Sequence, residues 1–343
     1  MANCEQISMG GGGDKPQTPK VRDERHDSVK YCLIVLVIAG HVIEYSETKV
    51  SVIVWNWIYI FHMPLFIFIS GYFSRKKDKE LWPSIWKLLE PLIVFQTVAI
   101  ITKLINGGET SFIDILTPWY VLWYLLSLIY WRLLLQVIPE RILRNAKLIL
   151  PTAFGISILT GFLPFDAFLS LHRTFAFMPF FFLGYCMRGK DICLPKKYKP
   201  LSFLFLILMV AVPLFFPQYL GVLTHSIPFG SIYDGGIYNA IKRMIVFSLA
   251  IPMSIAFINV CPNKPWIARQ GRLTMQYFIY HALVIIPLMV ITSELNIPMT
   301  FVTAIIYTIV LTVGLGLASR LTYFTKFTNP SSFLKKFPKT AKF

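Results

Sequence analysis

Long apolar stretches alternate along this chain with short polar connections that hold most of its charged residues. A helix that crosses the hydrocarbon core of a bilayer needs about 20 mostly apolar residues. All the stretches are long enough for such helices, although 147–163 is marginal. The pattern therefore predicts an all-α integral membrane protein with about ten transmembrane helices, at 31–48, 50–73, 85–105, 119–138, 147–163, 166–188, 200–220, 237–260, 273–293 and 297–325.

The basic residues are concentrated in every second connection. Apart from Lys49 and Lys103, the opposite connections hold no lysine or arginine outside the expected spans. Because basic connections stay in the cytoplasm, both termini are expected there. A transmembrane domain at 25–325 would lie between a flexible cytoplasmic tail at 1–24 and a basic cytoplasmic tail at 326–343. The basic side carries Arg75, Lys76, Lys77, Lys79, Lys87, Arg141, Arg144, Lys147, Arg188, Lys190, Lys196, Lys197, Lys199, Lys264, Arg269 and Arg272.

Composition agrees with a membrane protein. Hydrophobic residues make up 55% of the 343 residues and charged residues 15%. A formal net charge of +16 would suggest nucleic acid as the partner of a soluble protein, but the membrane topology explains it better. We therefore expect the bilayer as a partner and no nucleic acid. The five cysteines show neither a disulfide framework nor a metal-binding spacing, so no metal is expected.

Several ionisable residues lie inside the apolar stretches, where they are functional candidates because burial there is unfavourable. Counted from the segment ends, His41, His62 and His281 come near mid-depth on three separate helices. Each alone could be a packing histidine bonded to a backbone carbonyl, but together they indicate one shared polar cavity. The others are His172, Arg173, Lys242 and Arg243, the last two nearer the outer surface.

The first apolar segment carries two residues whose spacing matters. Lys30 and His41 are eleven positions apart, so a helix places them on nearly the same face, about 16 Å apart along its axis. The Lys30 ammonium would then lie at the membrane surface, and the His41 imidazole would lie on the same helix face inside the membrane. Glu44, one turn further on, could orient the imidazole as a carboxylate does in a triad, or could be an ordinary interfacial charge.

The fourth segment, 119–138, contributes an arginine and an aromatic cluster. Arg132 could reach a partner or extend toward the inner surface, and we assign it no role in the site. The aromatic residues are typical of the belt at a membrane interface and could also stack on a sugar ring. They are Trp119, Tyr120, Trp123 and Tyr124.

Three motifs resemble those of the membrane acyltransferase-3 family, in particular its fucose 4-O-acetylase-like branch. The resemblance extends from about Arg25 to Phe324, and the first two motifs together are its most specific part. The motifs are Arg25-x-Asp27-x-x-Lys30 followed after ten residues by His41, the run 61–72 (FHMPLFIFISGY), and Arg173 followed by the run 177–185 (FMPFFFLGY).

The resemblance implies a multi-pass O-acyltransferase, usually an O-acetyltransferase, of the bacterial inner membrane. The donor substrate would be cytoplasmic acyl-CoA, usually acetyl-CoA, with no tightly bound cofactor, and the acceptor a cell-surface or exported carbohydrate. His41 matches the histidine of the family's first helix, Lys30 its basic partner and His62 the second-helix histidine of the branch. Arg75 and Lys76 stand in a basic run where the family often has two arginines, and together with Lys30 would bind the nucleotide phosphates of the donor.

Acyl transfer to a hydroxyl needs a base for the hydroxyl proton and a positive or dipolar group for the tetrahedral oxyanion. His41 is the expected base. The oxyanion donor could be His62, His281 or Arg173, and the sequence does not rank them.

A transporter or flippase that moves a glycan or a lipid-linked precursor without bond chemistry is the alternative. Transporters also gather polar residues at mid-depth and often have interrupted helices. The chain has no clear internal repeat, and its mid-depth polar residues are rich in histidine, which favours the enzyme. Prolines interrupt several segments and weaken the distinction: Pro64, Pro91, Pro179, Pro213, Pro252 and Pro287.

Overall fold

The computed structural model describes most of the chain between the two expected tails. Every regular element within the described residues is a helix, so the all-α prediction holds for that part. The predicted tails at 1–24 and 326–343 lie outside the described residues, apart from Glu24. The described ranges are 24–76, 81–105, 107–164, 168–215, 223–226, 228–231 and 235–321.

Each of the ten apolar segments contains a helix. The main helices are α1 (Glu24–Ile43), α2 (Lys49–Phe73), α3 (Leu81–Ile105), α5 (Trp123–Val137), α7 (Ala146–Leu159), α8 (Leu171–Cys186), α9 (Lys199–Leu208), α12 (Gly236–Val260), α14 (Thr274–Glu294) and α15 (Phe301–Ala318). Shorter helices lie in the connections: α4 (Phe112–Leu116), α6 (Glu140–Arg144), α10 (Ala211–Phe215), α13 (Pro265–Gly271) and the 3-10 turns η1 (Thr160–Phe162), η2 (Phe168–Ser170), η3 (Lys196–Tyr198) and η4 (Phe229–Ser231).

Seven helical stretches of the described chain are long and apolar enough to cross a membrane, and the protein is a multi-pass membrane protein. The apolar helices α5 and α7 are shorter, so a total of ten crossings stays a prediction. The segment expected at 119–138 starts as a helix only at Trp123. Pro118 and the left-handed backbone of Tyr120, with φ of 48°, keep the preceding residues out of the helix.

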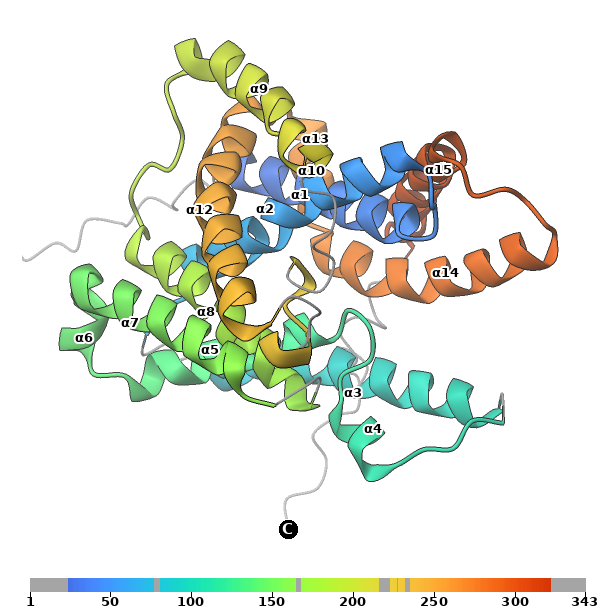
Figure 1. The fold of residues 1–343 in the computed structure, drawn as a ribbon, viewed down its shortest axis with the longest axis horizontal. Coiled ribbons are helices and arrows are strands. Elements are labelled where there is room, and N and C mark those ends of the chain that lie inside the picture. Colours follow the sequence, from blue (N-terminus) through green and yellow to red (C-terminus); the bar gives the residue numbers. More distant parts are fainter. Residues whose placement is uncertain are drawn as a thin grey trace, which may run out of the picture.

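Helices α1 and α2 lie in the middle of the bundle, between α14 and α15 on one side and α7, α8 and α12 on the other (Figure 1). Helices α2 and α8 pack closely against each other. A Cβ atom on Gly71 would lie 1.9 Å from the carbonyl oxygen of Phe181, and one on Gly184 would lie 2.0 Å from that of Phe68. Only glycine permits backbones to approach this closely, so the two motifs that suggested the family also fix the centre of the bundle.

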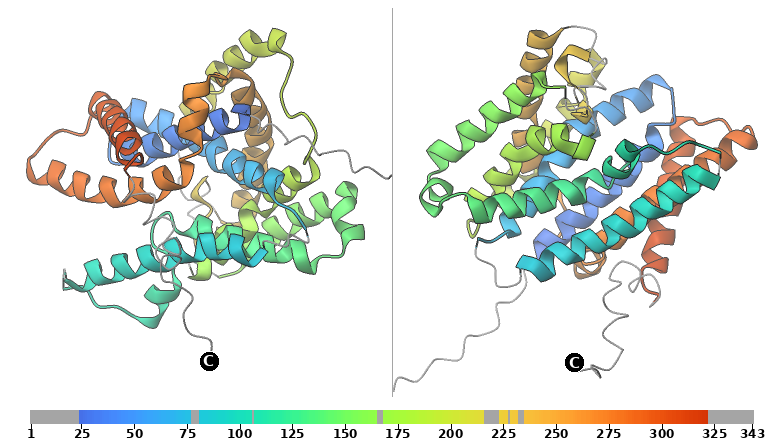
Figure 2. Two further views of the ribbon diagram at one scale, coloured as in Figure 1. Left: turned by 180° about the vertical axis from the view of Figure 1, so that it is seen from behind. Right: turned by 90° about the horizontal axis from the view of Figure 1, so that it is seen from below.

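Helix α3 lies at the edge of the bundle, and Figure 2 shows it from behind and from below. Only 17% of the most apolar 18-residue stretch of α3 is buried inside the protein. Its apolar exposed residues suit contact with lipid. The connection from α3 to α5, which includes α4, folds back against α3 and leads directly to Tyr120.

Candidate functional site

His41 lies in the last turn of α1 and is surrounded by side chains from three other parts of the chain. Its Nδ1 atom is 2.8 Å from the hydroxyl of Tyr120, 3.4 Å from the hydroxyl of Tyr59 and 3.4 Å from Oε2 of Glu44. Its Nε2 atom has no partner among the described residues, and 17% of the side chain remains exposed. One nitrogen is therefore held by hydrogen bonds, and the other forms none with the described residues.

Two of the three mid-depth histidines, His41 and His281, are in direct ring contact, and His62 is linked to His41 through Tyr59. The rings of His41 and His281 stack with their centroids 5.4 Å apart and their planes at 30°. The ring of Tyr59 lies between His41 and His62, 6.3 Å and 4.6 Å from them. Helices α1, α2 and α14 thus each supply one histidine to a cluster that we call the His41 cluster, made of His41, Glu44, Tyr59, His62, Tyr120, Arg173 and His281.

Hydrogen bonds fix which nitrogen of each imidazole holds the proton. His62 Nδ1 donates to the carbonyl of Ile58 at 2.9 Å, and His281 Nδ1 donates to the carbonyl of Tyr277 at 3.0 Å. The Nε2 atom of His281 is buried and has no partner among the described residues. In the neutral state this atom presents a lone pair, so His281 is better placed to accept a proton than to donate to an oxyanion.

The same reasoning applies to His41. A carboxylate can only accept a hydrogen bond, whereas a tyrosine hydroxyl can accept or donate. A proton on Nδ1 of His41 therefore satisfies both Glu44 and Tyr120. Nε2 then carries the lone pair, which is the state that a general base requires.

Arg173 brings a positive charge from α8 to this cluster. Its guanidinium lies 5.1 Å from the centre of the Trp123 ring and within electrostatic range of Tyr59 and Glu44. Its Nε atom is buried and has no partner among the described residues. Among the three expected oxyanion donors, Arg173 is the one with a free N–H group.

A cavity of about 630 Å³ opens beside Lys30, and we call it the Lys30 cavity. Its walls include three cations, Lys30, Arg75 and Arg132, together with Tyr124 and Phe278. The Phe278 ring lies 5.9 Å from that of His281, so the cavity reaches the edge of the His41 cluster. Lys30 also pairs with the buried carboxylate of Asp27 at 2.6 Å.

A second cavity, of about 660 Å³, lies between α3, the connection to α5 and α14. We call it the Trp119 cavity; its wall includes Tyr120, the partner of His41. Along α14, residues 274–278 line the Lys30 cavity and residues 283–287 line the Trp119 cavity. His281 lies between the two groups in sequence. The Lys30 cavity reaches the His41 cluster through Phe278, and the Trp119 cavity reaches it through Tyr120.

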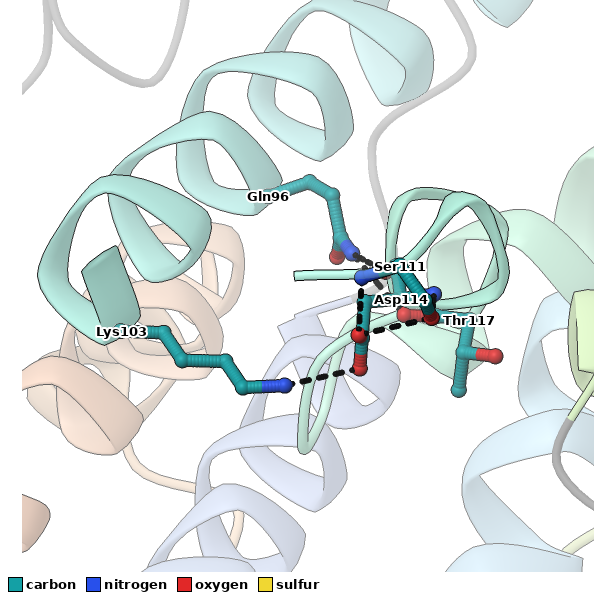
Figure 3. A network of polar contacts seen from close by, with 5 residues as sticks. All are labelled: Gln96, Lys103, Ser111, Asp114 and Thr117. Atoms are coloured by element: carbon teal, nitrogen blue, oxygen red, sulfur yellow. Dashed lines mark hydrogen bonds and ion pairs between the residues drawn. The ribbon is translucent and has the colours of Figure 1, made fainter. Parts of the chain in front are cut away.

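Polar contacts hold the connection against α3 (Figure 3). Gln96 donates to the carbonyls of Asp114 and Thr117, both at 2.9 Å, and its side-chain oxygen accepts from the amide of Trp119 at 2.8 Å. The backbone amide of Ser111 and then Lys103 lower the pKa of Asp114 to about 2. Because this pKa is depressed, the carboxylate stabilises the connection at higher pH, and the effect fades only as pH falls from 3.8 toward about 2.

The remaining expected residues occupy different places. Arg75 lines the Lys30 cavity with Lys30, but Lys76 donates to the carbonyl of Ile138 beside the end of α5. The aromatic residues expected at one interface separate: Trp119 and Tyr120 line one cavity, whereas Tyr124 lines the other. Within the described residues, no group of histidine, cysteine, aspartate and glutamate side chains could hold a metal ion.

Sequence reasoning missed three residues near this site. Arg132 was given no role but lines the Lys30 cavity, where its Nη1 also donates to the carbonyl of Ser84 at 3.1 Å. The sequence could have indicated Tyr59, because it precedes His62 by three positions and lies on the same face of the helix. No sequence pattern indicates the bond from Tyr120 to His41, since it joins positions 79 residues apart.

Comparison with known proteins identifies the chain. A sequence model of the acyltransferase-3 family, described as an acyltransferase domain, matches residues 24–319. A stretch of 69 residues is 42% identical to the nodulation protein NolL of Mesorhizobium japonicum, and covers 19% of this chain and 18% of that relative. No solved structure matches. The family match covers most of the chain, which therefore belongs to the acyltransferase-3 family.

Proposed function

We propose that the protein is an O-acyltransferase that moves an acyl group, usually acetyl, from acyl-CoA to a carbohydrate hydroxyl, with His41 as the general base. The observation that carries this proposal is that the His41 cluster shares Tyr120 with one cavity and contacts Phe278 in the wall of the other, which is lined by three cations. One cavity suits the donor and the other leaves a separate approach for the acceptor.

The Lys30 cavity suits the donor because CoA carries several phosphate charges. Lys30, Arg75 and Arg132 offer those charges ammonium and guanidinium partners in the wall of the cavity. Lys30 and His41 are about 16 Å apart by helical rise, and an extended pantetheine arm can follow that direction to the base. With the positive connections in the cytoplasm, this cavity opens to the cytoplasmic side of a bacterial inner membrane.

The reaction needs one proton acceptor and one stabiliser of negative charge. Nε2 of His41 takes the proton from the acceptor hydroxyl as the hydroxyl oxygen attacks the thioester carbonyl. Arg173 stabilises the oxyanion that forms on the carbonyl oxygen. When that intermediate collapses, the C–S bond breaks, and the proton on Nε2 passes to the departing CoA thiolate.

The acceptor is proposed from the family resemblance and from the second cavity. The wall of the Trp119 cavity combines an indole, on which a sugar ring can stack, with the polar side chains of Gln96, Lys103 and Asp114. The cavity borders Tyr120 and therefore leads a hydroxyl toward His41.

Membranes that contain the protein, incubated with acetyl-CoA labelled in the acetyl group, test this function. We expect label in the glycan fraction, with matching release of free CoA, and none in membranes of cells that lack the protein. A glycan that changes sides of the membrane without gaining acetyl mass would overturn the enzyme and favour the transporter. Mass analysis of the labelled glycan identifies both the acyl group and its acceptor.

A further inference from the structure

Tyr120 combines a strained backbone with a short bond to His41. Its φ of 48° places it in the left-handed region, which is unfavourable for any residue with a Cβ atom. Its hydroxyl lies 2.8 Å from Nδ1 of His41, and the two rings are 4.8 Å apart. A residue persists in such a conformation when its surroundings determine it, and this occurs most often where function depends on the geometry.

The surroundings that determine it lie on α3. Both ends of the Gln96 side-chain amide bond to the connection. Its NH₂ group donates to the backbone carbonyls of Asp114 and Thr117, and its oxygen accepts from the backbone N–H of Trp119. The last of these bonds holds the residue directly before Tyr120. Figure 3 shows Gln96 reaching from α3 to the turn at Ser111, Asp114 and Thr117. A lipid-facing helix is thereby linked through one side chain to the partner of His41.

We propose that Tyr120 is a positioning residue for His41 and that Gln96 holds it in place through the connection. This inference rests on the proposed function. The Tyr120 oxygen accepts the Nδ1 proton of His41, which fixes the tautomer and the plane of the ring. Nε2 then faces the reacting groups with its lone pair.

Two observations favour this role over that of an ordinary aromatic residue at the membrane interface. An interfacial tyrosine directs its hydroxyl toward headgroups and water, whereas the Tyr120 hydroxyl meets an imidazole inside the bundle. The hydroxyl of Tyr59 reaches the same nitrogen only at 3.4 Å, so Tyr120 provides the stronger bond.

The test compares Tyr120→Phe, Gln96→Leu and the double variant of the full chain in membranes. Tyr130→Phe is the matched control, because Tyr130 lies on α5 and its hydroxyl bonds no described residue. We expect Tyr120→Phe to lower kcat about tenfold and to leave the KM for acetyl-CoA unchanged. Gln96→Leu should lower kcat in the same way, and the double variant should match Tyr120→Phe because the two residues act in series.

A second measurement does not depend on acyl transfer. Diethyl pyrocarbonate modifies accessible imidazoles, and mass analysis of the peptide that contains His41 gives the rate. Release of the ring should raise this rate in Tyr120→Phe and Gln96→Leu and leave it unchanged in Tyr130→Phe. If kcat and the modification rate stay at wild-type values in both variants, or if the double variant shows additive losses, the inference is overturned.

The two measurements separate this inference from the proposed function. If the wild-type protein transfers no acetyl group, the proposed function fails, and the modification rate alone decides whether Tyr120 orients His41. If the wild-type protein is active and Tyr120→Phe matches it in both measurements, only the positioning role fails.

Discussion

Two groups of ionisable residues lie among the helices, and the hydrogen bonds of their central residues, His41 and Arg243, differ in kind. In the His41 cluster, Nδ1 of His41 meets side-chain oxygens of Tyr120, Tyr59 and Glu44. We call the other group the Arg243 cluster; it consists of Arg243, His172, His225, Ser157 and Phe229. There Arg243 donates to the carbonyl of Ser157 at 2.8 Å, and His172 donates to the carbonyl of His225 at 3.1 Å.

The difference distinguishes residues that hold helices together from residues that can take part in a reaction. Arg243 is 1% exposed and lies 4.2 Å from the centre of the Phe229 ring, so it joins α12 to α7 and to η4. A cation bonded to a neighbouring backbone and covered by an aromatic ring stabilises an arrangement of helices. His41 instead bonds side chains, and one of them, Tyr120, lines the Trp119 cavity. The kind of partner therefore distinguishes His41 from Arg243 and His172, whereas His62 and His281 share the backbone bonding of the second group.

The largest expected effect is on His41. His41→Ala should lower acyl transfer about 10²- to 10⁴-fold, because general-base catalysis is lost, and should leave the unfolding midpoint in detergent unchanged. His172→Ala is the matched control from the Arg243 cluster, and it should lower the midpoint but retain activity per folded molecule. An active His41→Ala protein would remove the distinction between the clusters.

Arg243→Ala tests whether the Arg243 cluster stabilises the fold and takes no part in catalysis. The change removes a hydrogen bond from a charged donor and the contact with Phe229, so we expect a loss of roughly 1.5–3 kcal/mol in the free energy of unfolding. Thermal unfolding in detergent measures this, with activity per folded molecule retained. Ser248→Ala on the exposed face of α12 is the control and should change stability by less than about 0.5 kcal/mol. Loss of transfer without loss of stability would place Arg243 in the catalytic machinery.

The sequence predicted the helices and placed the three histidines at similar depth, because both inferences depend on the fixed rise of a helix. His41, His62 and His281 have similar depth on any arrangement of straight helices, and packing then had only to bring three faces together. The role of Tyr120 could not be predicted, since its contact with His41 depends on a left-handed backbone conformation and on a hydrogen bond to Gln96 in another helix. Arg132 was missed because the direction of a side chain into a cavity depends on which helices surround it.

Lys30 distinguishes donor binding from a purely structural ion pair. Lys30→Glu should raise the KM for acyl-CoA roughly tenfold, because attraction of the phosphates turns into repulsion, whereas Lys30→Arg should largely preserve it. The KM for the acceptor should not change. Kinetics at varied acyl-CoA measure the first constant, and kinetics at varied acceptor measure the second. If Lys30 only neutralises the buried Asp27, the charge reversal should instead lower stability and leave the donor KM unchanged.

The smallest expected effect concerns Glu44. Its carboxylate lies 3.4 Å from His41 Nδ1 and is 43% exposed, so solvent weakens its interaction with the imidazole. Glu44→Gln should therefore lower kcat by less than about fivefold, and the difference from wild type should shrink further at high salt.

Steady-state kinetics at two salt concentrations measure the contribution of Glu44, with Tyr120→Phe as the comparison. A loss as large as that of His41→Ala would mean that Glu44 completes a triad with His41. In that case the charge on the carboxylate, and not the hydroxyl of Tyr120, would decide which nitrogen of His41 is free to act.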